Sequence, residues 1–159
     1  MAYLIDGNNL IGHFSSADLR DPQSKPLLVL KLQRFQRQKK IRVLVVFDGT
    51  ADLNLIGKNY QRKNFSVIFP SFEQNADDTI KDIISKQTDL RRFFVVSSDR
   101  EIRNFTKAKG AKSLSCEEFE RELKSTLREQ KKSLEEEKNV TPPSSFEINQ
   151  WLKIFKDKK

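Results

Sequence analysis

Short apolar runs, separated by helical patterns, constrain the fold of this 159-residue chain more than any other feature. The runs span residues 3–5, 43–47, 65–69, 93–96 and, more weakly, 111–115. Leucines after Pro26, and isoleucines spaced by three and four residues from Ile80, predict helices between them. Strands that alternate with helices predict a parallel sheet with helices on both faces. We therefore expect an α/β fold, a Rossmann-like three-layer sandwich with about five parallel strands.

The pattern changes after Cys116, which divides the chain into a core and an extension. We interpret residues 1–116 as the α/β core and residues 117–159 as a C-terminal helical extension of the same domain. Residues 117–137 hold sparse apolar positions among many charges, which predicts a long, largely solvated helix. Ser144 and Glu147 have capping-box spacing for a last helix, from which Trp151 would dock against the domain.

Charge and cysteine content limit the function classes. The formal net charge is +8, which favours a polyanionic partner such as a nucleic acid, although a lysine-rich proteome would give the same balance. A single cysteine excludes an intrachain disulfide. No apolar run approaches the ~20 residues that a membrane span needs. We expect no membrane partner, and a location in the cytoplasm, or in an organelle stroma if the chain is plastid-encoded.

Acidic residues follow four of the predicted strands, or begin the helices after them. Because parallel strands end at the same edge of a sheet, these side chains should converge there. Each one alone could be a helix N-cap or a turn residue. As a set, clustered carboxylates repel one another unless a cation neutralises them, and hard oxygen ligands suit Mg²⁺ or Mn²⁺. The residues of this set are Asp6, Asp48, Asp77, Asp78 and Asp99.

An acidic metal pocket on a basic surface suits the hydrolysis of a nucleic acid. Lys and Arg would hold the phosphodiester backbone, and the metal would activate water. Asn8 and Asn9 would orient a carboxylate, a water or a phosphate. The only histidine, His13, excludes ribonuclease chemistry that uses paired histidines.

Four segments of the chain resemble the NYN domains of the PIN-like nuclease superfamily, and most closely their YacP-like branch. The segments are "LIDGNNL", "LVVFDGT", "NADDTI" and "VVSSDREI", and the tail "SSFEINQWLKIF" is similar to that of the branch. The resemblance implies a Rossmann-like fold and a metal-dependent endoribonuclease that hydrolyses RNA. Members of this branch are associated with RNA turnover, in some cases on the ribosome.

The resemblance also implies roles for particular residues. By motif position, Asp6, Asp77 or Asp78, and Asp99 would be the catalytic, metal-site carboxylates. The residues that would support them are Asn8, Asp48 and Ser97. If a helix starts at Ala76, adjacent residues differ by about 100° around its axis, so only one of the acidic pair need face the metal. Of the two, we favour Asp77.

Candidate RNA contacts follow from the position of basic residues relative to the predicted site. Lys58, Arg62 and Lys63 lie in the region after Asp48, and Tyr60 among them could stack on a base. Arg100 and Arg103 directly follow Asp99. A further row of i, i+3 cations faces away from the leucines of its helix, and we expect it to be a solvated surface. This row consists of Lys31, Arg34 and Arg37.

Other interpretations of the motifs fit the sequence less well. "VFDGT" suggests a phosphatase of the haloacid dehalogenase type, but Val46 stands where that chemistry needs a nucleophilic aspartate. The loop after the first strand lacks the glycine pattern of a dinucleotide-binding fold. The toxin of a toxin–antitoxin pair would also be a nuclease, but the C-terminal helices give no sign of one. The main alternative is a non-catalytic RNA- or ribosome-binding module with the same fold, which would have no need of the acids.

Overall fold

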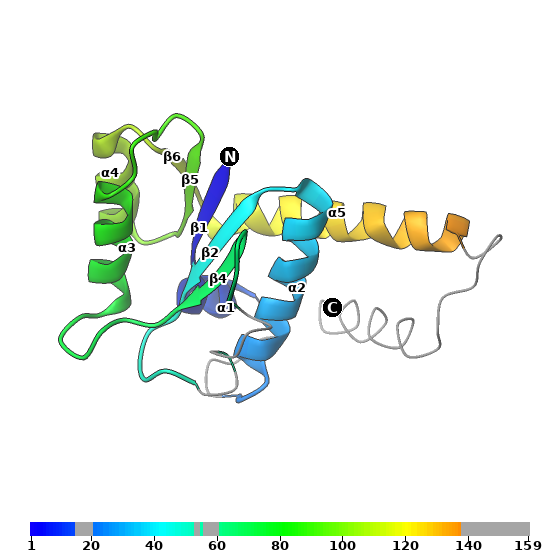
Figure 1. Cartoon of the computed structure of the whole chain (residues 1–159), viewed down its shortest axis with the longest axis horizontal. Helices are drawn as coiled ribbons and strands as arrows, with labels where there is room; N and C mark the ends of the chain where they lie inside the picture. The colour runs from blue at the N-terminus through cyan, green and yellow to red at the C-terminus, as the bar shows by residue number, and fades with distance from the viewer. Residues whose placement is uncertain (15–20, 53–54, 56–60, 138–159) are drawn as a thin grey trace.

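A six-stranded sheet with helices on both faces forms the frame of the protein (Figure 1). The computed structural model describes residues 1–14, 21–52, 55 and 61–137. The strands are β1 (Ala2–Asp6), β2 (Arg42–Val46), β3 (Gln61–Arg62), β4 (Phe65–Ile68), β5 (Phe93–Val96) and β6 (Lys112–Leu114). The helices are α1 (Gly7–His13), α2 (Ser24–Lys39), α3 (Ala76–Ser85), α4 (Arg100–Lys109) and α5 (Cys116–Glu137).

The strand order, β3-β4-β2-β1-β5-β6, confirms the predicted α/β fold. All neighbouring pairs are parallel except β3 and β4. The five strands expected from the apolar runs are present within one residue at each end. The sixth, β3, consists of two exposed polar residues and leaves no apolar pattern in the sequence.

The centre of the sheet is a topological switch point. From β1 the chain builds outward through β2 and β4 on one side, and then crosses to β5 and β6 on the other. Ligands of open α/β sheets bind beyond the carboxyl ends of the strands at such a point. Here that point lies beyond Asp6 and Val96, the last residues of β1 and β5.

Alternate residues of the strands pack into two separate hydrophobic cores, one on each face of the sheet. Tyr3 and Ile5 of β1 belong to the core that α1, α2 and α5 cover, whereas Leu4 belongs to the core under α3 and α4. This alternation is the two-residue period of a strand that is buried on both faces. The result is the predicted three-layer arrangement, with α3 and α4 in one outer layer and α1, α2 and α5 in the other.

Helix α5 is part of the first core. Its residues Phe119, Leu123 and Leu127 are buried with the side chains of α2 and β1. The Tyr3 hydroxyl also donates a hydrogen bond of 2.9 Å to Glu122 Oε1. The helix predicted over residues 117–137 is therefore confirmed, but one of its faces is fully buried. The last helix predicted from Ser144 lies outside the described residues.

Helix α2 differs from its prediction in two respects. It begins at Ser24, so that Pro26 occupies its first turn, where a missing backbone N–H costs nothing. The prediction that its cationic row is a solvated surface is wrong for Lys31, which is buried with its Nζ 5.5 Å from the Phe14 ring centre. Arg37, near the end of the row, is exposed as predicted.

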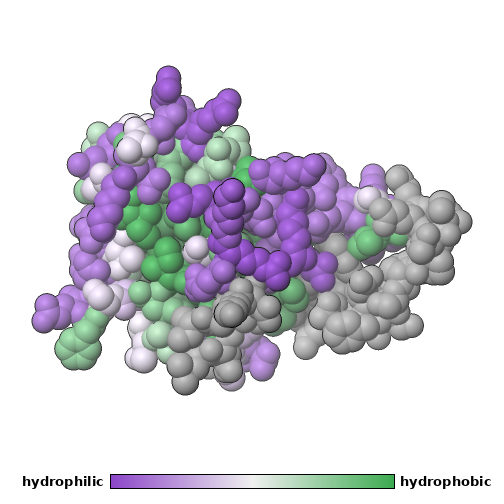
Figure 2. Space-filling view, viewed as in Figure 1, coloured by the Kyte–Doolittle hydropathy of each residue, from purple (hydrophilic) through white to green (hydrophobic). Residues whose placement is uncertain are grey.

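No helix within the described residues is long and apolar enough to cross a membrane. Figure 2 shows hydrophilic side chains over the helices, and apolar side chains in view in the middle of the same face.

Candidate active site

The turn from β1 into α1 places Asp6 at the carboxyl edge of the sheet. Gly7 starts the helix where no side chain fits, because a Cβ there would lie 2.5 Å from Phe47 Cε1 and 3.0 Å from the Val46 carbonyl oxygen. This close approach lets α1 begin directly at the strand end. Asp6 is consequently held between β2 and β5 and is 5% exposed.

The Ser97 hydroxyl connects two of the predicted metal-site residues. It donates a hydrogen bond of 3.0 Å to Asp6 Oδ2. Its oxygen in turn accepts a hydrogen bond of 3.1 Å from the backbone N–H of Asp99. Ser97 is itself buried, so the two bonds fix the end of β5 against the end of β1.

The environment of Asp6 disfavours its charge. The pKa of its carboxyl is raised from 3.8 to about 6, chiefly by burial and to a smaller extent by the neighbouring carboxylates Asp77 and Asp99. The hydroxyl of Ser97 and the backbone of Asn9 oppose this shift by stabilising the ionised form. A buried carboxyl held among like charges is the condition that a bound cation would relieve.

Asp48 and Asn8 join β2 to the neighbouring helices. Asn8 Oδ1 accepts a hydrogen bond of 2.9 Å from the backbone N–H of Asp48. Asp48 Oδ1 accepts from the backbone N–H of Gly49 at 3.0 Å and of Ala76, the first residue of α3, at 3.3 Å. The turn at Asp48 therefore also positions the start of the helix that carries Asp77.

The two acids at the start of α3 have different environments. Asn75 is the N-cap, and its side chain accepts a hydrogen bond of 2.8 Å from the backbone N–H of Asp78. The Asp78 carboxylate completes the capping box by accepting from the Asn75 backbone N–H at 3.5 Å. Asp77 takes no part in this cap. Burial, and then the charges of Asp99 and Glu101, raise the pKa of Asp77.

Asp99 combines a structural role with a place at the site. It is the N-cap of α4, and its Oδ1 accepts hydrogen bonds from the backbone N–H groups of Glu101 at 2.9 Å and Ile102 at 3.2 Å. One carboxylate oxygen is enough for both bonds. The cap interpretation of this residue and the metal-site interpretation are therefore compatible.

The structure brings the five predicted acids to one edge but does not close them into a metal cage. Among the described residues, no group of three or more His, Cys, Asp or Glu side chains is arranged to hold a metal ion. The electrostatic coupling runs from Asp6 to Asp77 and Asp99. These three carboxylates offer hard oxygen donors, the donor type that suits divalent cations. Because Mg²⁺ keeps several waters, it needs only one or two direct carboxylate bonds.

Two of the predicted RNA contacts do not lie at this edge. Arg62 pairs with Phe65 at the start of β4, and Phe65 is level with Val43 at the start of β2. That level is three residues, about 10 Å, short of Asp6 along the strands. Lys63 follows in the exposed turn to β4. Both residues are thus at the amino edge, because the chain returns there after Asp48. Lys58 and Tyr60 lie outside the described residues.

The last two predicted contacts begin α4. Arg100 is the first residue of that helix and is exposed at the carboxyl edge. Arg103 lies one turn further on, and its Nε donates a hydrogen bond of 3.3 Å to Ser113 Oγ. Of these two residues, Arg100 is the one that lies beside the carboxylates.

Other side chains at the carboxyl edge were missed by sequence reasoning. Lys25, in the first turn of α2, has its Nζ 5.6 Å from the ring centre of Phe47, the residue before Asp48. Lys81 lies one turn after Asp77, where its charge lowers the pKa of that carboxyl, and it forms an ion pair with Glu101. Lys81 could have been found from its i, i+4 spacing to Asp77. Lys25 lies too far along the chain for any such signal.

An exposed aromatic residue stands in the loop between β4 and α3, which projects from the body of the protein (Figure 1). Phe72 is fully exposed. The loop is ordered by hydrogen bonds from Gln74 N to Ser71 O at 2.9 Å and from Gln74 Nε2 to Asp82 Oδ2 at 2.8 Å. Phe72 could have been recognised in the sequence as a large apolar residue within a polar segment.

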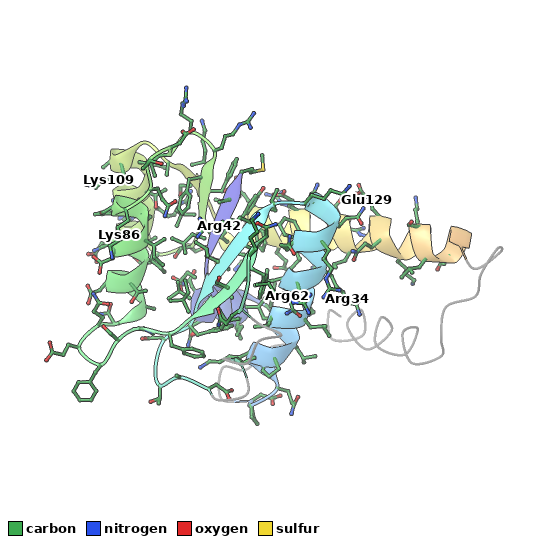
Figure 3. The ribbon with its side chains drawn as sticks, in the orientation of Figure 1. Arg34, Arg42, Arg62, Lys86, Lys109 and Glu129 are labelled. Carbon is green, nitrogen blue, oxygen red and sulfur yellow. The ribbon has the colours of Figure 1, made fainter. Side chains whose placement is uncertain are left out.

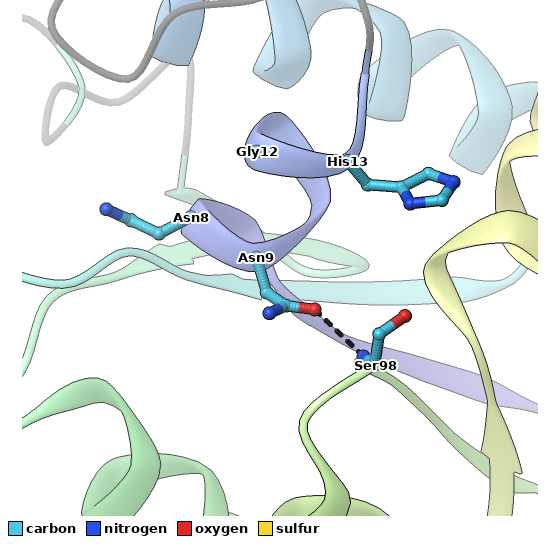
Figure 4. A pocket seen from close by; sticks show the side chains of 5 residues that line it. All are labelled: Asn8, Asn9, Gly12, His13 and Ser98. Atoms are coloured by element: carbon cyan, nitrogen blue, oxygen red, sulfur yellow. Dashed lines mark hydrogen bonds between the residues drawn. The ribbon is translucent and has the colours of Figure 1, made fainter.

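A pocket of about 480 Å³ lies along α1, beside the carboxylates (Figure 4). Its lining residues are Asn8, Asn9, Gly12, His13 and Ser98. Asn9 Oδ1 accepts hydrogen bonds from the Ser98 backbone N–H at 2.8 Å and from the Cys116 thiol at 3.0 Å. The Asn8 oxygen is also occupied, by the N–H of Asp48. The amide NH₂ groups of both asparagines therefore remain as donors.

His13 closes the far end of this pocket. Its Nε2 lies 3.4 Å from Glu120 Oε2 on α5. Gly12, one turn from Asn8, contributes no side chain, which leaves room along the helix. The pocket is thus lined by neutral donors and an imidazole ring.

Comparison with known proteins identifies the family. The model of the YacP-like NYN domain matches residues 3–153, nearly the whole chain. The chain belongs to the YacP-like NYN domain family. It also has the fold of Rae1 (YacP) from Bacillus subtilis, with a TM-score of 0.78, 24% identity, and coverage of 98% of this chain and 92% of the other. A variant of Rae1 with one tryptophan replaced by leucine gives a TM-score of 0.72, 22% identity, and coverage of 99% and 92%.

Among curated proteins, none matches the chain. The NYN assignment nevertheless confirms the resemblance seen in the four sequence motifs. It indicates a nuclease-like, RNA-related function. Nucleases of the NYN and PIN-like type generally use divalent metals. The family match also extends beyond residue 116, over α5 and up to residue 153.

Proposed function

We propose that the protein is a metal-dependent endoribonuclease that hydrolyses RNA phosphodiester bonds at the carboxyl edge of its sheet. The observation that carries this proposal is the buried carboxyl of Asp6, which Ser97 links to Asp99 and whose pKa is raised in part by Asp77. Such an arrangement costs free energy, and a cation bound at the site would offset that cost.

Each residue of the site has a distinct role in this proposal. Asp6, Asp77 and Asp99 would hold Mg²⁺ or Mn²⁺, and Ser97 would keep the Asp6 carboxylate in position. A bound ion of this kind supplies an activated water and stabilises the charge that develops on phosphorus. Asn8 and Asp48 would fix α3, and hence Asp77, relative to β1.

The substrate strand would be held by groups on both sides of the carboxylates. Lys25 and Arg100 lie at the same edge and would contact phosphate oxygens. The pocket along α1 would take one unpaired nucleoside, whose base and ribose carry oxygen acceptors for the asparagine amides. The ring of His13 offers a surface for stacking, and so does that of Phe72.

The cellular setting of the activity is a further part of the proposal. We place it in mRNA turnover, on or near the ribosome in the cytoplasm, with support from the family resemblance alone. The alternative function, a non-catalytic RNA- or ribosome-binding module, would use the same basic surface. It gives no reason, however, to bury Asp6 beside two further acids.

RNA cleavage with matched variants tests the proposal. We expect the purified protein to cut single-stranded RNA in Mg²⁺ or Mn²⁺, and we expect EDTA or Asp6→Asn to abolish the cutting. Asp89→Asn is the control, because Asp89 is an exposed acid just before β5, at the opposite edge. Cleavage that survives in Asp6→Asn would reject the assigned site. RNA binding without cleavage, on free RNA and on ribosomes, would favour the binding module.

A further inference from the structure

Besides Arg62, ten exposed basic residues lie at the amino edge of the sheet, opposite to the candidate active site. We name this set the amino-edge rim. Its members come from strand starts, a turn and the ends of three helices. They are Lys39, Lys40, Arg42, Lys63, Lys86, Arg91, Arg92, Lys107, Lys109 and Lys112.

Backbone contacts fix the rim at this edge. The Arg42 N–H donates to the Met1 carbonyl oxygen at 3.3 Å, and the Ala2 N–H donates to the Arg92 carbonyl oxygen at 3.0 Å. These bonds join the starts of β1, β2 and β5. Lys112 begins β6 and is level with Phe94. Figure 3 labels three members: Lys86 and Lys109 lie on the side of α3 and α4, and Arg42 lies at the sheet.

The rim is almost free of acidic partners. Among the described residues, Arg91 is the one member that forms an ion pair, through its Nε, 3.3 Å from Asp89 Oδ1. A concentration of like charge without counter-charges costs free energy through repulsion, which a polyanion would remove. At the carboxyl edge, by contrast, the basic residue Lys81 has an acidic partner, Glu101.

The helix dipole explains the positions of only half of the rim residues. Basic residues stabilise the C-terminal ends of helices, which accounts for the lysines that end or cap α2, α3 and α4. It does not account for Arg42, Arg91, Arg92 and Lys112, which start strands or directly precede them, or for Lys63 in a turn. Strand ends carry no comparable dipole.

We propose that the amino-edge rim is a second RNA-binding surface, separate from the site of cleavage, which binds the phosphate backbone of a folded RNA. Six strands at about 4.8 Å make this edge roughly 24 Å wide, enough for several consecutive phosphates. Arg42 is level with Ala2, four residues or about 13 Å from Asp6 along β1. The rim therefore contacts a part of the RNA that is not being cut, and this inference goes beyond the proposed nuclease activity.

The test compares two triple variants that remove equal charge. One removes rim charges that no helix dipole explains, in Arg42→Gln, Arg92→Gln and Lys112→Gln. The other removes exposed charges from α5, in Arg121→Gln, Arg128→Gln and Lys132→Gln. Binding of an RNA hairpin is measured in EDTA against salt concentration. Because each phosphate contact contributes roughly 0.7–0.9 to the salt slope, we expect the rim variant to lose about two to three units and the α5 variant to keep the wild-type slope.

Equal losses of slope in the two variants would overturn the proposal, because net charge alone would then explain binding. Binding of the wild type to phosphatidylserine vesicles, without binding to the hairpin, would assign the rim to a membrane surface and overturn it as well. The assay needs no metal and no cleavage, so it is independent of the nuclease proposal. A short unstructured RNA should be cut equally by the wild type and the rim variant.

Discussion

The hydroxyl of Ser97 donates a 3.0 Å hydrogen bond to Asp6 Oδ2 across 91 residues of sequence. This contact joins the ends of β1 and β5, the two strands that flank the switch point of the sheet. The same hydroxyl oxygen accepts the Asp99 backbone N–H, so one buried side chain sets the positions of two acids. The relative position of Asp6 and Asp99 is therefore fixed at the ends of two adjacent strands.

The raised pKa of Asp6 predicts how stability depends on pH. Between pH 3.8 and about 6 the folded protein keeps a proton that the unfolded chain has released. The free energy of unfolding therefore falls through this interval as the pH rises, and stays low above it. In EDTA, Asp6→Asn should raise the free energy of unfolding by about 2–3 kcal/mol at neutral pH and by little near pH 4.

Urea unfolding at both pH values measures this difference. Asp89→Asn serves as the control, because hydrogen bonds from Arg91 lower the pKa of that exposed carboxyl, and no stabilisation at neutral pH is expected. If Asp6→Asn raised the free energy of unfolding equally at both pH values, burial of the ionised Asp6 carboxyl would not be the cause of the effect.

The acidic pair at the start of α3 allows a matched comparison of neighbours. Asp77→Asn should reduce RNA cleavage by at least about 100-fold, because Asp77 is coupled to Asp6 and Asp99. Asp78→Asn should leave cleavage near the wild-type rate and cost at most ~1 kcal/mol of stability, since Asp78 belongs to the capping box. Cleavage rates and thermal unfolding measure the two effects. The reverse order of activities would assign the site to Asp78.

The pocket along α1 can be tested through its glycine. Gly12 is exposed and lies in a helix without a positive φ, so larger residues are tolerated by the backbone. Gly12→Leu should fill the pocket and raise the KM for RNA about tenfold, whereas Gly12→Ala should change it little. Both variants should be slightly more stable than the wild type, because Gly is a poor helix former. Equal KM values for Leu and Ala would show that no nucleoside enters this pocket.

The sequence alone supports most of the sheet and the acidic edge. Buried parallel strands are continuous apolar runs, and their order along the chain places Asp6, Asp48 and Asp99 at a common edge. The choice between Asp77 and Asp78 depended on where α3 begins, and the N-cap at Asn75 shows which of the two completes the cap.

What the sequence could not supply depends on tertiary position. The two-residue strand β3 carries no pattern, and Arg62 was therefore expected in a loop near the site instead of at the amino edge. Lys31 looked solvated from its helical spacing, but packing against Phe14 buries it. Lys25 reaches the site because α2 starts at the carboxyl edge, which only the completed fold reveals.

Binding of Mn²⁺ measured by titration calorimetry at neutral pH tests the central claim most directly, because it asks whether the carboxylates act together on a cation. We expect the wild type and Asp89→Asn to bind the ion with similar affinity, and Asp6→Asn and Asp77→Asn to lose measurable binding. Binding of Mn²⁺ by Asp6→Asn with the affinity of the wild type would contradict the proposed metal site.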